Sequence, residues 1–415
     1  MRKYLIEKPY QFVPPLRTAW PQRWLLAGGF VERHLARAFG VVAHECRQLD
    51  LLRESLQAGR AIVLCPNHPR QSDPLALACV ARETPCPMYI MASWHLFNQG
   101  WFNRLRLRMM GAFSVYREGL DRQAIDEAIG ILERGERPLL IFPEGTTSRT
   151  NDFLLSLMEG PAFIARTAAK RREKQGLPPV VVHPVALRYL FQGNLESACR
   201  PVLDEIEQRL TWKPSRRLPL IDRIVKVGNA LLTLQELQYG LQAEAGATLK
   251  QRQTSLVNAL LQPLEREWLG GPQDQNGIAI RVKNLRMKIF PDLSRAALDE
   301  LERERRWRQL EDTYLAQQVD CYPAEYITRF PSVDRILEVV EKFEEDLADN
   351  VRVHGQMKVI VQVGPAIEVA RERERKVAED PLMGELRGRL ESMLEGLQAE
   401  SRLYLPEGTP GPEGG

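Results

Sequence analysis

Two short polar blocks carry the residues best suited to chemistry, and they lie about seventy residues apart in the chain. In the first block, residues 67–73, His68 is followed five positions later by Asp73. The other block, residues 142–149, is a turn rich in hydroxyl groups and free backbone N–H groups. An imidazole held by a carboxylate can take a proton from a hydroxyl, and N–H groups can stabilise an oxyanion. Together the blocks indicate an enzyme with the components that acyl transfer requires.

The first block is predicted to form a loop rather than a helix. On a continuous helix, side chains five positions apart would point about 140° apart and could not meet. Prolines on both sides of His68 exclude a regular helix there, whereas Asp73 followed by Pro74 is typical of a helix N-terminus. We therefore expect His68 after an apolar strand at 61–65, with Asp73 folding back onto one imidazole nitrogen. In the alternative interpretation, Asp73 only caps the helix and His68 is an ordinary loop residue.

Two further segments bring the number of blocks to four. In chain order the blocks are 67–73, 111–117, 142–149 and 180–187, and we number them one to four. The second block ends in Arg117 after a short apolar run, and the fourth is an apolar run interrupted by proline. With these, residues 57–195 resemble the glycerolipid acyltransferase family, which includes lysophosphatidic acid and glycerol-3-phosphate acyltransferases. The resemblance implies that His68 and Asp73 are the catalytic dyad. It also implies that Arg117 contacts the phosphate of the acceptor. The full acceptor site implied by the resemblance is Arg117, Glu144, Gly145, Thr146, Thr147 and Arg149.

One position departs from the family pattern. Members that make phosphatidate usually carry an arginine directly after Gly-Thr, whereas this chain has Thr147 there and its next basic residue is Arg149. This shifted charge leaves the identity of the acceptor headgroup open. The family resemblance implies a lysophospholipid acceptor, with 1-acylglycerol-3-phosphate as the first candidate. Another lysolipid, glycerol-3-phosphate and simple thioester hydrolysis stay open, as does a non-catalytic membrane-surface interaction protein.

The resemblance further implies direct transfer from an acyl-CoA or acyl carrier protein thioester, with no metal and no bound cofactor. No G-x-S-x-G nucleophile elbow is present, which disfavours a covalent route. His68 would act as the base and Asp73 would orient it.

The core is predicted to be α/β, with a mostly parallel sheet and flanking helices. Apolar runs at 61–65, 87–92, 139–142 and 180–187 alternate with helical patterns near 74–82, 98–109, 121–134 and 160–172. Residues 196–350 change to long charged helices with three-four apolar spacing, which indicates a large helical insert of unassigned role. Residues 351–405 are expected to return a closing strand and helix to the core, and 406–415, rich in Gly, Pro and Glu, to be disordered.

The N-terminal segment, residues 1–56, has its own character. In residues 1–60 basic residues outnumber acidic ones by ten to five. Trp20, Trp24, Phe30 and their apolar neighbours have spacings that predict one amphipathic helical face flanked by arginines. Such a helix can lie in an anionic lipid interface or simply dock on the core. The family resemblance favours the membrane surface.

Composition limits the remaining possibilities. A net charge of +3 is too small to suggest nucleic acid as a partner, and the uncharged stretches are far shorter than a bilayer requires. The first residues lead into no apolar core of a secretory signal. The six cysteines lack metal-site or disulfide-framework spacing. These features lead us to expect a cytoplasmic protein that associates peripherally with a membrane.

Overall fold

The computed structural model describes residues 7–210, 212–295, 298–321, 325–348, 352–370 and 380–406. Within these ranges one eight-stranded sheet has the order β1-β7-β6-β2-β5-β3-β4, and β8 pairs with β6. Neighbouring strands are parallel except that β6 runs antiparallel to β7 and β8. The strands are β1 (Val41–Arg47), β2 (Ala61–Pro66), β3 (Tyr89–Ser93), β4 (Ala112–Val115), β5 (Leu139–Leu140), β6 (Val180–Phe191), β7 (Met357–Val363) and β8 (Ile367–Glu368). The predicted α/β class with a mostly parallel sheet is confirmed.

Both faces of the sheet are covered by helices, and the side chains of β2 show how. Ala61, Val63 and Cys65 pack into one apolar cluster, whereas Ile62 and Leu64 pack into another. This follows from the strand period of two, which sends successive side chains to opposite faces. Since every residue of β2 is buried, the strand has the continuous apolar character of a central parallel strand.

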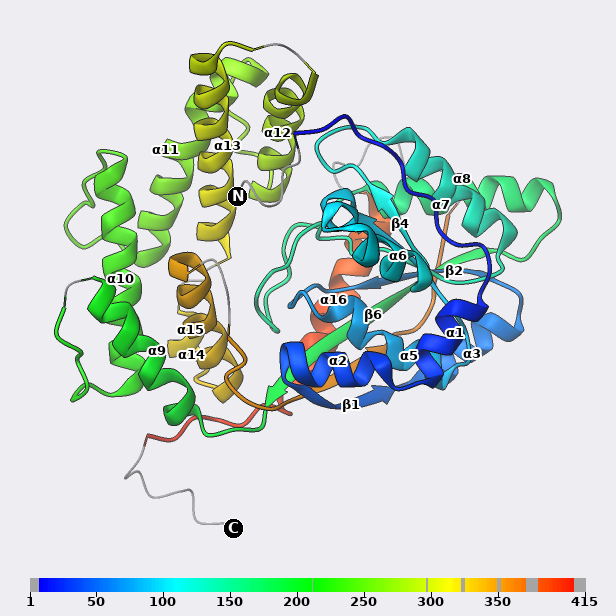
Figure 1. Cartoon of the computed structure of the whole chain (residues 1–415), viewed down its shortest axis with the longest axis horizontal. Coiled ribbons are helices and arrows are strands. Elements are labelled where there is room, and N and C mark those ends of the chain that lie inside the picture. Colours follow the sequence, from blue (N-terminus) through cyan, green and yellow to red (C-terminus); the bar gives the residue numbers. More distant parts are fainter. Residues whose placement is uncertain are drawn as a thin grey trace.

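The helices of the core divide between these two faces (Figure 1). The face of Val63 is covered by α7 (Arg122–Arg134), α8 (Gly160–Lys174) and α16 (Pro381–Gln398). The face of Leu64 is covered by α1 (Trp20–Ala27), α2 (Phe30–Phe39), α3 (Leu49–Gln57), α4 (Asp73–Ala76) and α5 (Ala78–Glu83). A 3₁₀ turn η1 (Trp94–Asn98) and α6 (Trp101–Met109) join β3 to β4.

Local sequence sets these helix ends. The Asp121 side chain accepts a hydrogen bond from the Ala124 N–H and so caps α7, which ends at Gly135 with φ of 66°. Pro74 occupies the first turn of α4 after Ser72 at the N-cap, as the Asp-Pro sequence predicted. The start of α4 therefore holds Asp73 directly beside the end of β2.

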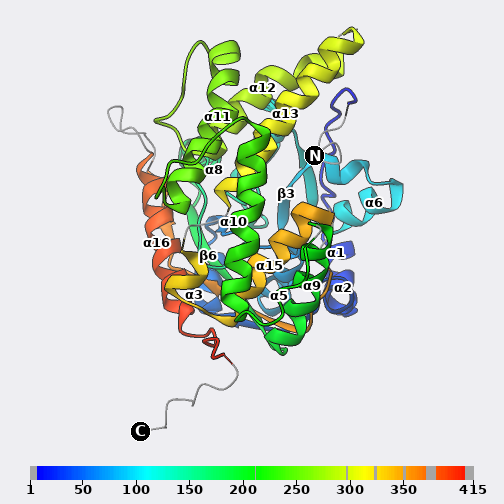
Figure 2. The same ribbon diagram turned by 90° about the vertical axis from the view of Figure 1, so that its left-hand side faces the viewer.

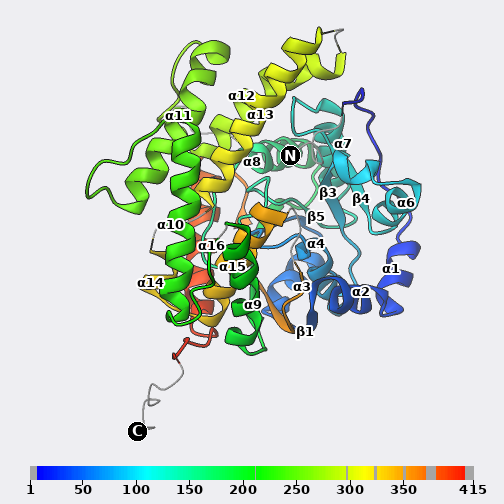
Figure 3. The same ribbon diagram turned by 60° about the vertical axis from the view of Figure 1, so that its left-hand side comes forward.

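All the helices between β6 and β7 form a second group beside the sheet (Figures 1 and 3). They are α9 (Leu195–Arg209), α10 (Leu220–Gln238), α11 (Leu249–Leu269), α12 (Ile278–Arg295), α13 (Glu300–Asp320), α14 (Tyr326–Arg329) and α15 (Val333–Ala348). Helices α10–α13 share a further apolar cluster, whereas α9, α15 and the first half of α10 pack on the cluster of the sheet. Figure 2 shows α10 and α15 in front of the sheet. This helical group occupies the part of the chain where an insert was expected.

The N-terminal segment differs from its prediction in two ways. β1 pairs with β7 and so belongs to the sheet, although residues 1–56 had been assigned to a separate segment. The expected single helical face is divided into α1 and α2, because Gly29 takes a φ of 63°, which interrupts a right-handed helix. Leu26, Val31 and Leu35 are buried in the core, while Trp20, Trp24 and Phe30 are exposed.

At the other end of the chain, the expected disordered tail 406–415 lies, apart from Pro406, outside the described residues. β7 and α16 stand where the closing strand and helix were expected. Within the described ranges, none of the helices combines the length and the apolar character that spanning a bilayer requires.

Candidate active site

The expected dyad is present at the carboxyl end of β2. His68 Nδ1 and Asp73 Oδ2 are 2.7 Å apart. Asp73 is fully buried, whereas the His68 side chain keeps 16% of its surface exposed. The Arg70 N–H donates to the same Asp73 oxygen over 2.9 Å, so this carboxylate also closes the loop that carries the histidine. The open edge of a parallel sheet is where α/β proteins place their sites.

The other oxygen of Asp73 has its own donor. Tyr189, in β6, donates its hydroxyl to Asp73 Oδ1 over 2.6 Å, and Ser72 donates to the Tyr189 oxygen over 3.0 Å. Burial and the charge of Asp73 raise the pKa of Tyr189 well above its usual range, so the phenol keeps its proton and remains a donor. A carboxylate accepts hydrogen bonds only, and these donors suit its charged form.

A stacked aromatic ring and two backbone hydrogen bonds also fix the position of His68. The ring of Phe142 stacks on that of His68, with 4.0 Å between ring centres. The backbone of His68 is fixed at both ends, since its N–H donates to Glu144 Oε1 over 2.6 Å and its carbonyl accepts from the Ser148 N–H over 2.8 Å. No hydrogen bond engages His68 Nε2 within the described residues. With Nδ1 donating to Asp73, Nε2 is the nitrogen left to accept a proton.

Glu144 is placed differently from what its predicted role suggested. Its side chain is fully buried, and its second oxygen accepts from the Leu155 N–H over 2.8 Å. Burial raises the pKa of Glu144 to about 7, against the opposing effect of the two backbone N–H donors. The two carboxylate oxygens thus accept hydrogen bonds from the backbone N–H groups of His68 and Leu155. In this structure Glu144 is therefore a positioning residue.

Gly145 connects the second and third sequence blocks. Its carbonyl accepts from Arg117 Nη1 over 2.8 Å, and its φ is 70°. A side chain there would be strained, and its Cβ would come within 3.2 Å of the Met158 methyl group. Arg117 thereby lies at the same sheet edge as the dyad, although it follows β4.

The two threonines and Arg149 form the rest of the turn. Thr147 Oγ1 accepts from Arg149 Nε over 3.1 Å, and Arg149 has a φ of 64°. The Arg149 guanidinium forms an ion pair with Glu345 of α15. Within the described part of the chain, the Thr146 side chain makes no hydrogen bond. Arg149 is therefore occupied by a carboxylate from the helical group rather than directed at open space.

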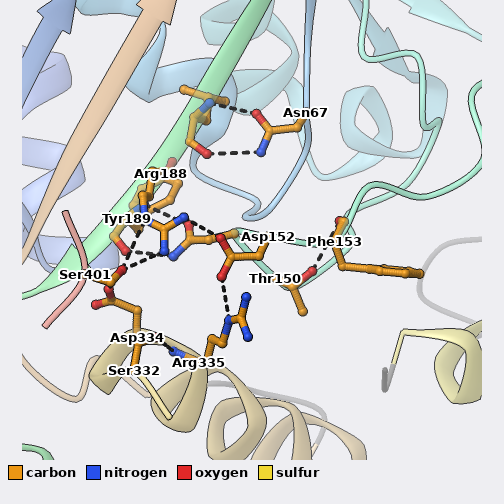
Figure 4. A network of polar contacts seen from close by, with 12 residues as sticks. Asn67, Thr150, Asp152, Phe153, Arg188, Tyr189, Ser332, Asp334, Arg335 and Ser401 are labelled. Carbon is orange, nitrogen blue, oxygen red and sulfur yellow. Dashed lines mark hydrogen bonds and ion pairs between the residues drawn. The ribbon is translucent and has the colours of Figure 1, made fainter. Parts of the chain in front are cut away.

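Helix α15 makes a second contact of this kind, since Arg70 of the catalytic loop pairs with Glu341 over 2.7 Å. Around it, Asp152 accepts from Arg335 over 2.7 Å and also pairs with the buried Arg188 (Figure 4). These ion pairs join the loop after the third block to α15 and β6. The sequence analysis assigned no role to the carboxylates of α15.

Two asparagines dock the catalytic loops on β6. Asn67 exchanges a pair of hydrogen bonds with the backbone of Leu187, at 3.0 and 2.7 Å. Asn151 does the same with the backbone of Tyr189, at 2.8 Å in both directions. Figure 4 shows Asn67 beside the strand. Sequence reasoning missed Asn67, Asn151 and Tyr189 as site residues. Only the adjacency of Asn67 to His68 could have indicated one of them.

Comparison with known proteins agrees with this geometry. Residues 49–188 match the protein-family model described as Acyltransferase, and this range holds the dyad and the whole third block, residues 142–149. Over 132 residues the chain is 30% identical to a protein of Streptococcus pneumoniae (strain ATCC BAA-255 / R6) named 1-acyl-sn-glycerol-3-phosphate acyltransferase. The alignment covers 31% of this chain and 44% of that relative, so the chain spans less than half the relative's length. The family match ends before α9, and the helical group lies outside it.

Proposed function

We propose that this chain, which matches the Acyltransferase family model over residues 49–188, transfers a fatty acyl group from an acyl thioester to a hydroxyl of 1-acylglycerol-3-phosphate. The observation that supports this most strongly is the His68–Asp73 pair at the end of β2, with Nε2 open. Acyl-CoA and an acyl carrier protein thioester are both donors to be tested.

In the proposed mechanism, Nε2 of His68 takes the proton of the acceptor hydroxyl while that oxygen attacks the thioester carbonyl. A new C–O bond forms, and the carbonyl becomes a tetrahedral oxyanion. Asp73 stabilises the imidazolium that results. When the intermediate collapses, the C–S bond breaks and the leaving thiolate receives the proton from His68. The products are the diacyl lipid and a free thiol.

For the oxyanion we propose donors in the turn of the third block. Within the described chain, the backbone N–H groups of Thr146 and Thr147 make no hydrogen bond to other backbone groups. Preorganised N–H donors are the usual means of stabilising such charge in acyl transfer. Glu144 and Gly145 would keep the turn in place, through the contacts described above.

We further propose that the acceptor is met at a membrane surface, because the adjoining helices α1, α2 and α6 expose five large aromatic side chains. Trp20, Trp24 and Phe30 are 67%, 54% and 44% exposed. Trp101 and Phe102 of the neighbouring α6 are 77% and 64% exposed. Exposed arginines accompany both groups: Arg23, Arg33, Arg37, Arg104 and Arg106. Aromatic side chains with interspersed arginines are typical of helices that lie at an anionic lipid interface.

Helices α1 and α6 are held next to each other. Gln22 donates its side-chain amide to the carbonyl of Met110 over 2.9 Å, and Arg108 donates to the carbonyl of Pro14 over 3.2 Å. We define the exposed residues Trp20, Trp24, Phe30, Trp101 and Phe102 as the aromatic surface. The part of the aromatic surface on α1 and α2 and the part on α6 can therefore bind the same membrane at once.

The test is an acyl-transfer assay with purified protein, both donors and a panel of acceptors on vesicles. Formation of phosphatidate from 1-acylglycerol-3-phosphate, and its loss in His68→Ala, is the expected result. Free fatty acid as the sole product would instead indicate a hydrolase. Transfer only to a lysolipid with another headgroup would show that 1-acylglycerol-3-phosphate is not the acceptor.

A further inference from the structure

Two buried guanidinium nitrogens near the site have no hydrogen-bond partner within the described residues. They are Nε of Arg117, which follows β4, and the Nη2 atom of Arg286, on α12 of the helical group. A buried donor without an acceptor is costly, and more so on a charged group. A bound ligand that accepts hydrogen bonds from both nitrogens would remove this cost.

The hydrogen-bond acceptors of these two arginines are neutral groups. Arg117 donates to the carbonyl of Gly145 over 2.8 Å, and Arg286 donates from Nε to the hydroxyl of Thr313 over 3.1 Å. In the described chain neither guanidinium forms an ion pair with a carboxylate within 4.0 Å. This sets them apart from Arg70 and Arg149, whose charges are paired with Glu341 and Glu345.

Packing brings the two arginines toward one another across the junction of core and helical group. Tyr116, the residue before Arg117, packs against the apolar cluster formed by α10–α13. Leu285 and Ile289 of α12 belong to that cluster, and Arg286 follows directly after Leu285. Burial and the charge of Arg117 lower the pKa of Arg286 to about 10, so the two cations influence each other.

The surroundings do little to offset this positive charge. Burial and the charge of Arg117 also lower the pKa of His95 to about 4, which keeps this neighbouring imidazole neutral at pH 7. Glu118 acts on Arg286 in the opposite sense, as a single carboxylate. Arg117 and Glu118 thus act on Arg286 with opposite signs, and within the described residues neither Arg117 nor Arg286 has a carboxylate in ion-pair contact.

We propose that Arg286 and Arg117 together bind the phosphate of the acceptor, so that the helical group supplies part of the acceptor site. This rests on the proposed function, because it assumes that a phosphorylated acceptor reaches His68. Two guanidinium groups offer several N–H donors to phosphate oxygens and match the double charge of a phosphomonoester. A phosphodiester headgroup carries one negative charge and would leave one cation uncompensated. The site therefore selects a phosphomonoester acceptor.

The experiment compares acceptors that share a hydroxyl and differ only in phosphate: 1-acylglycerol-3-phosphate and monoacylglycerol. The variant is Arg286→Met, and Lys288→Met is its matched control, because Lys288 is an exposed cation on the same helix. Binding of glycerol 3-phosphate to each full-length protein is measured by calorimetry, which needs no turnover.

For Arg286→Met we expect kcat/KM for the phosphorylated acceptor to fall roughly 10–100-fold, mainly through KM, as the loss of a charge-assisted hydrogen bond predicts. Turnover of monoacylglycerol and the KM of the donor should not change. Affinity for glycerol 3-phosphate should fall by a similar factor, and Lys288→Met should behave as the wild type. If Arg286→Met does not fold, Arg286→Lys keeps the charge without the planar fork and should show a smaller loss of the same kind.

The outcomes separate this inference from the proposed function. If the wild type transfers acyl groups to the phosphorylated acceptor and a folded Arg286 variant shows unchanged acceptor selectivity and glycerol 3-phosphate affinity, the inference is overturned and the function stands. If the wild type transfers no acyl group but binds glycerol 3-phosphate through Arg286, the function is overturned and the phosphate site stands. A wild type that neither binds glycerol 3-phosphate nor uses the phosphorylated acceptor overturns both.

Discussion

The Tyr189 hydroxyl donates a 2.6 Å hydrogen bond to Oδ1 of Asp73, the oxygen that His68 does not use. The proposed catalytic pair is therefore the outer part of a chain of hydrogen bonds that begins at Tyr189 in β6. A strand of the sheet core fixes the carboxylate, and the carboxylate fixes the imidazole. The orientation of His68 should accordingly depend on a residue that does not touch substrate.

Replacing Tyr189 by Phe removes this donor without changing the shape of the ring. We expect kcat to fall about tenfold with little change in either KM, because Asp73 loses one of its charge-assisted hydrogen bonds. Steady-state kinetics test this, with the pH profile of kcat as a second readout. Tyr326→Phe is the control, since Tyr326 is also buried and donates to Glu338 over 2.7 Å. Equal losses in both variants would show that the effect is general destabilisation.

Glu144 should make stability depend on pH. Its pKa is raised by burial from 4.5 to about 7 in the folded protein, so the folded state holds a proton that the unfolded state releases. Its contribution to stability is therefore full below about pH 4.5 and is lost as pH rises through about 7. Measured by denaturant unfolding, wild type should lose stability relative to Glu144→Gln across this window. A difference between the two proteins that stays constant with pH would contradict the prediction.

The ion pair between Arg149 and Glu345 changes what an Arg149 variant is expected to show. Arg149→Ala should lower the melting temperature, because it leaves the Glu345 carboxylate partly buried without its partner. Glu345→Gln in the same protein should recover part of that loss. A double-mutant cycle measures this coupling, which we expect to be on the order of 1–3 kcal/mol. Additive effects would mean that the pair contributes nothing.

Arg117→Ala, in contrast, should raise the KM of the acceptor far more than the KM of the donor. Arg117 retains an unpaired nitrogen at the site, whereas the guanidinium of Arg149 is occupied. Initial-rate measurements with each substrate varied in turn distinguish the two cases. An effect confined to the donor would place Arg117 at the thioester instead.

Binding to membranes should depend on the aromatic surface of α1, α2 and α6. Trp101→Ser combined with Phe102→Ser should weaken flotation with anionic vesicles, and salt should weaken wild-type binding, since each basic residue contributes about 1 kcal/mol near such a surface. Leu301→Ser is a suitable control, because Leu301 is 83% exposed but lies on α13. Binding that is insensitive to both changes would leave these residues without a membrane role.

These point substitutions are preferable to deleting residues 1–45. The segment holds more than an exposed face, since Val13 donates its N–H to the buried Ser114 hydroxyl over 2.8 Å and β1 starts at Val41. Its removal would strip a strand from the sheet edge and open the core. A loss of vesicle binding in such a truncation would have no single cause.

Local patterns explain which features the sequence could reveal. The strand at 61–65 is a continuous apolar run between turn residues, and Asp73-Pro74 carries its own helix-start signal, so the loop and its dyad could be predicted from neighbouring residues alone. β1 alternates weakly, with most of its residues only partly buried, and thus resembles the amphipathic segment before it. The glycine break between α1 and α2 was a visible signal that the helical interpretation passed over.

Contacts between distant parts of the chain could not be predicted, because local patterns do not show which segments meet in the fold. Tyr189 reaches Asp73 across the sheet, and Glu341 and Glu345 reach the site from α15, nearly two hundred residues after the third block. Acidic residues on a charged helix are normally solvated, and nothing in their spacing distinguishes these two. Helix α15 lies just before β7 in the chain, packs on α9 and β6, and so reaches the loops of the candidate site through the fold of the whole chain.

The most direct test of the account is the rate of acyl transfer to 1-acylglycerol-3-phosphate by wild type and by His68→Ala, measured with a labelled thioester donor. His68 lies on a loop, so the variant should fold with a melting temperature close to that of wild type. Loss of the general base predicts a rate about 10²–10⁴-fold lower. A folded His68→Ala protein that turns over near the wild-type rate would contradict the assignment of the His68–Asp73 pair as the catalytic dyad.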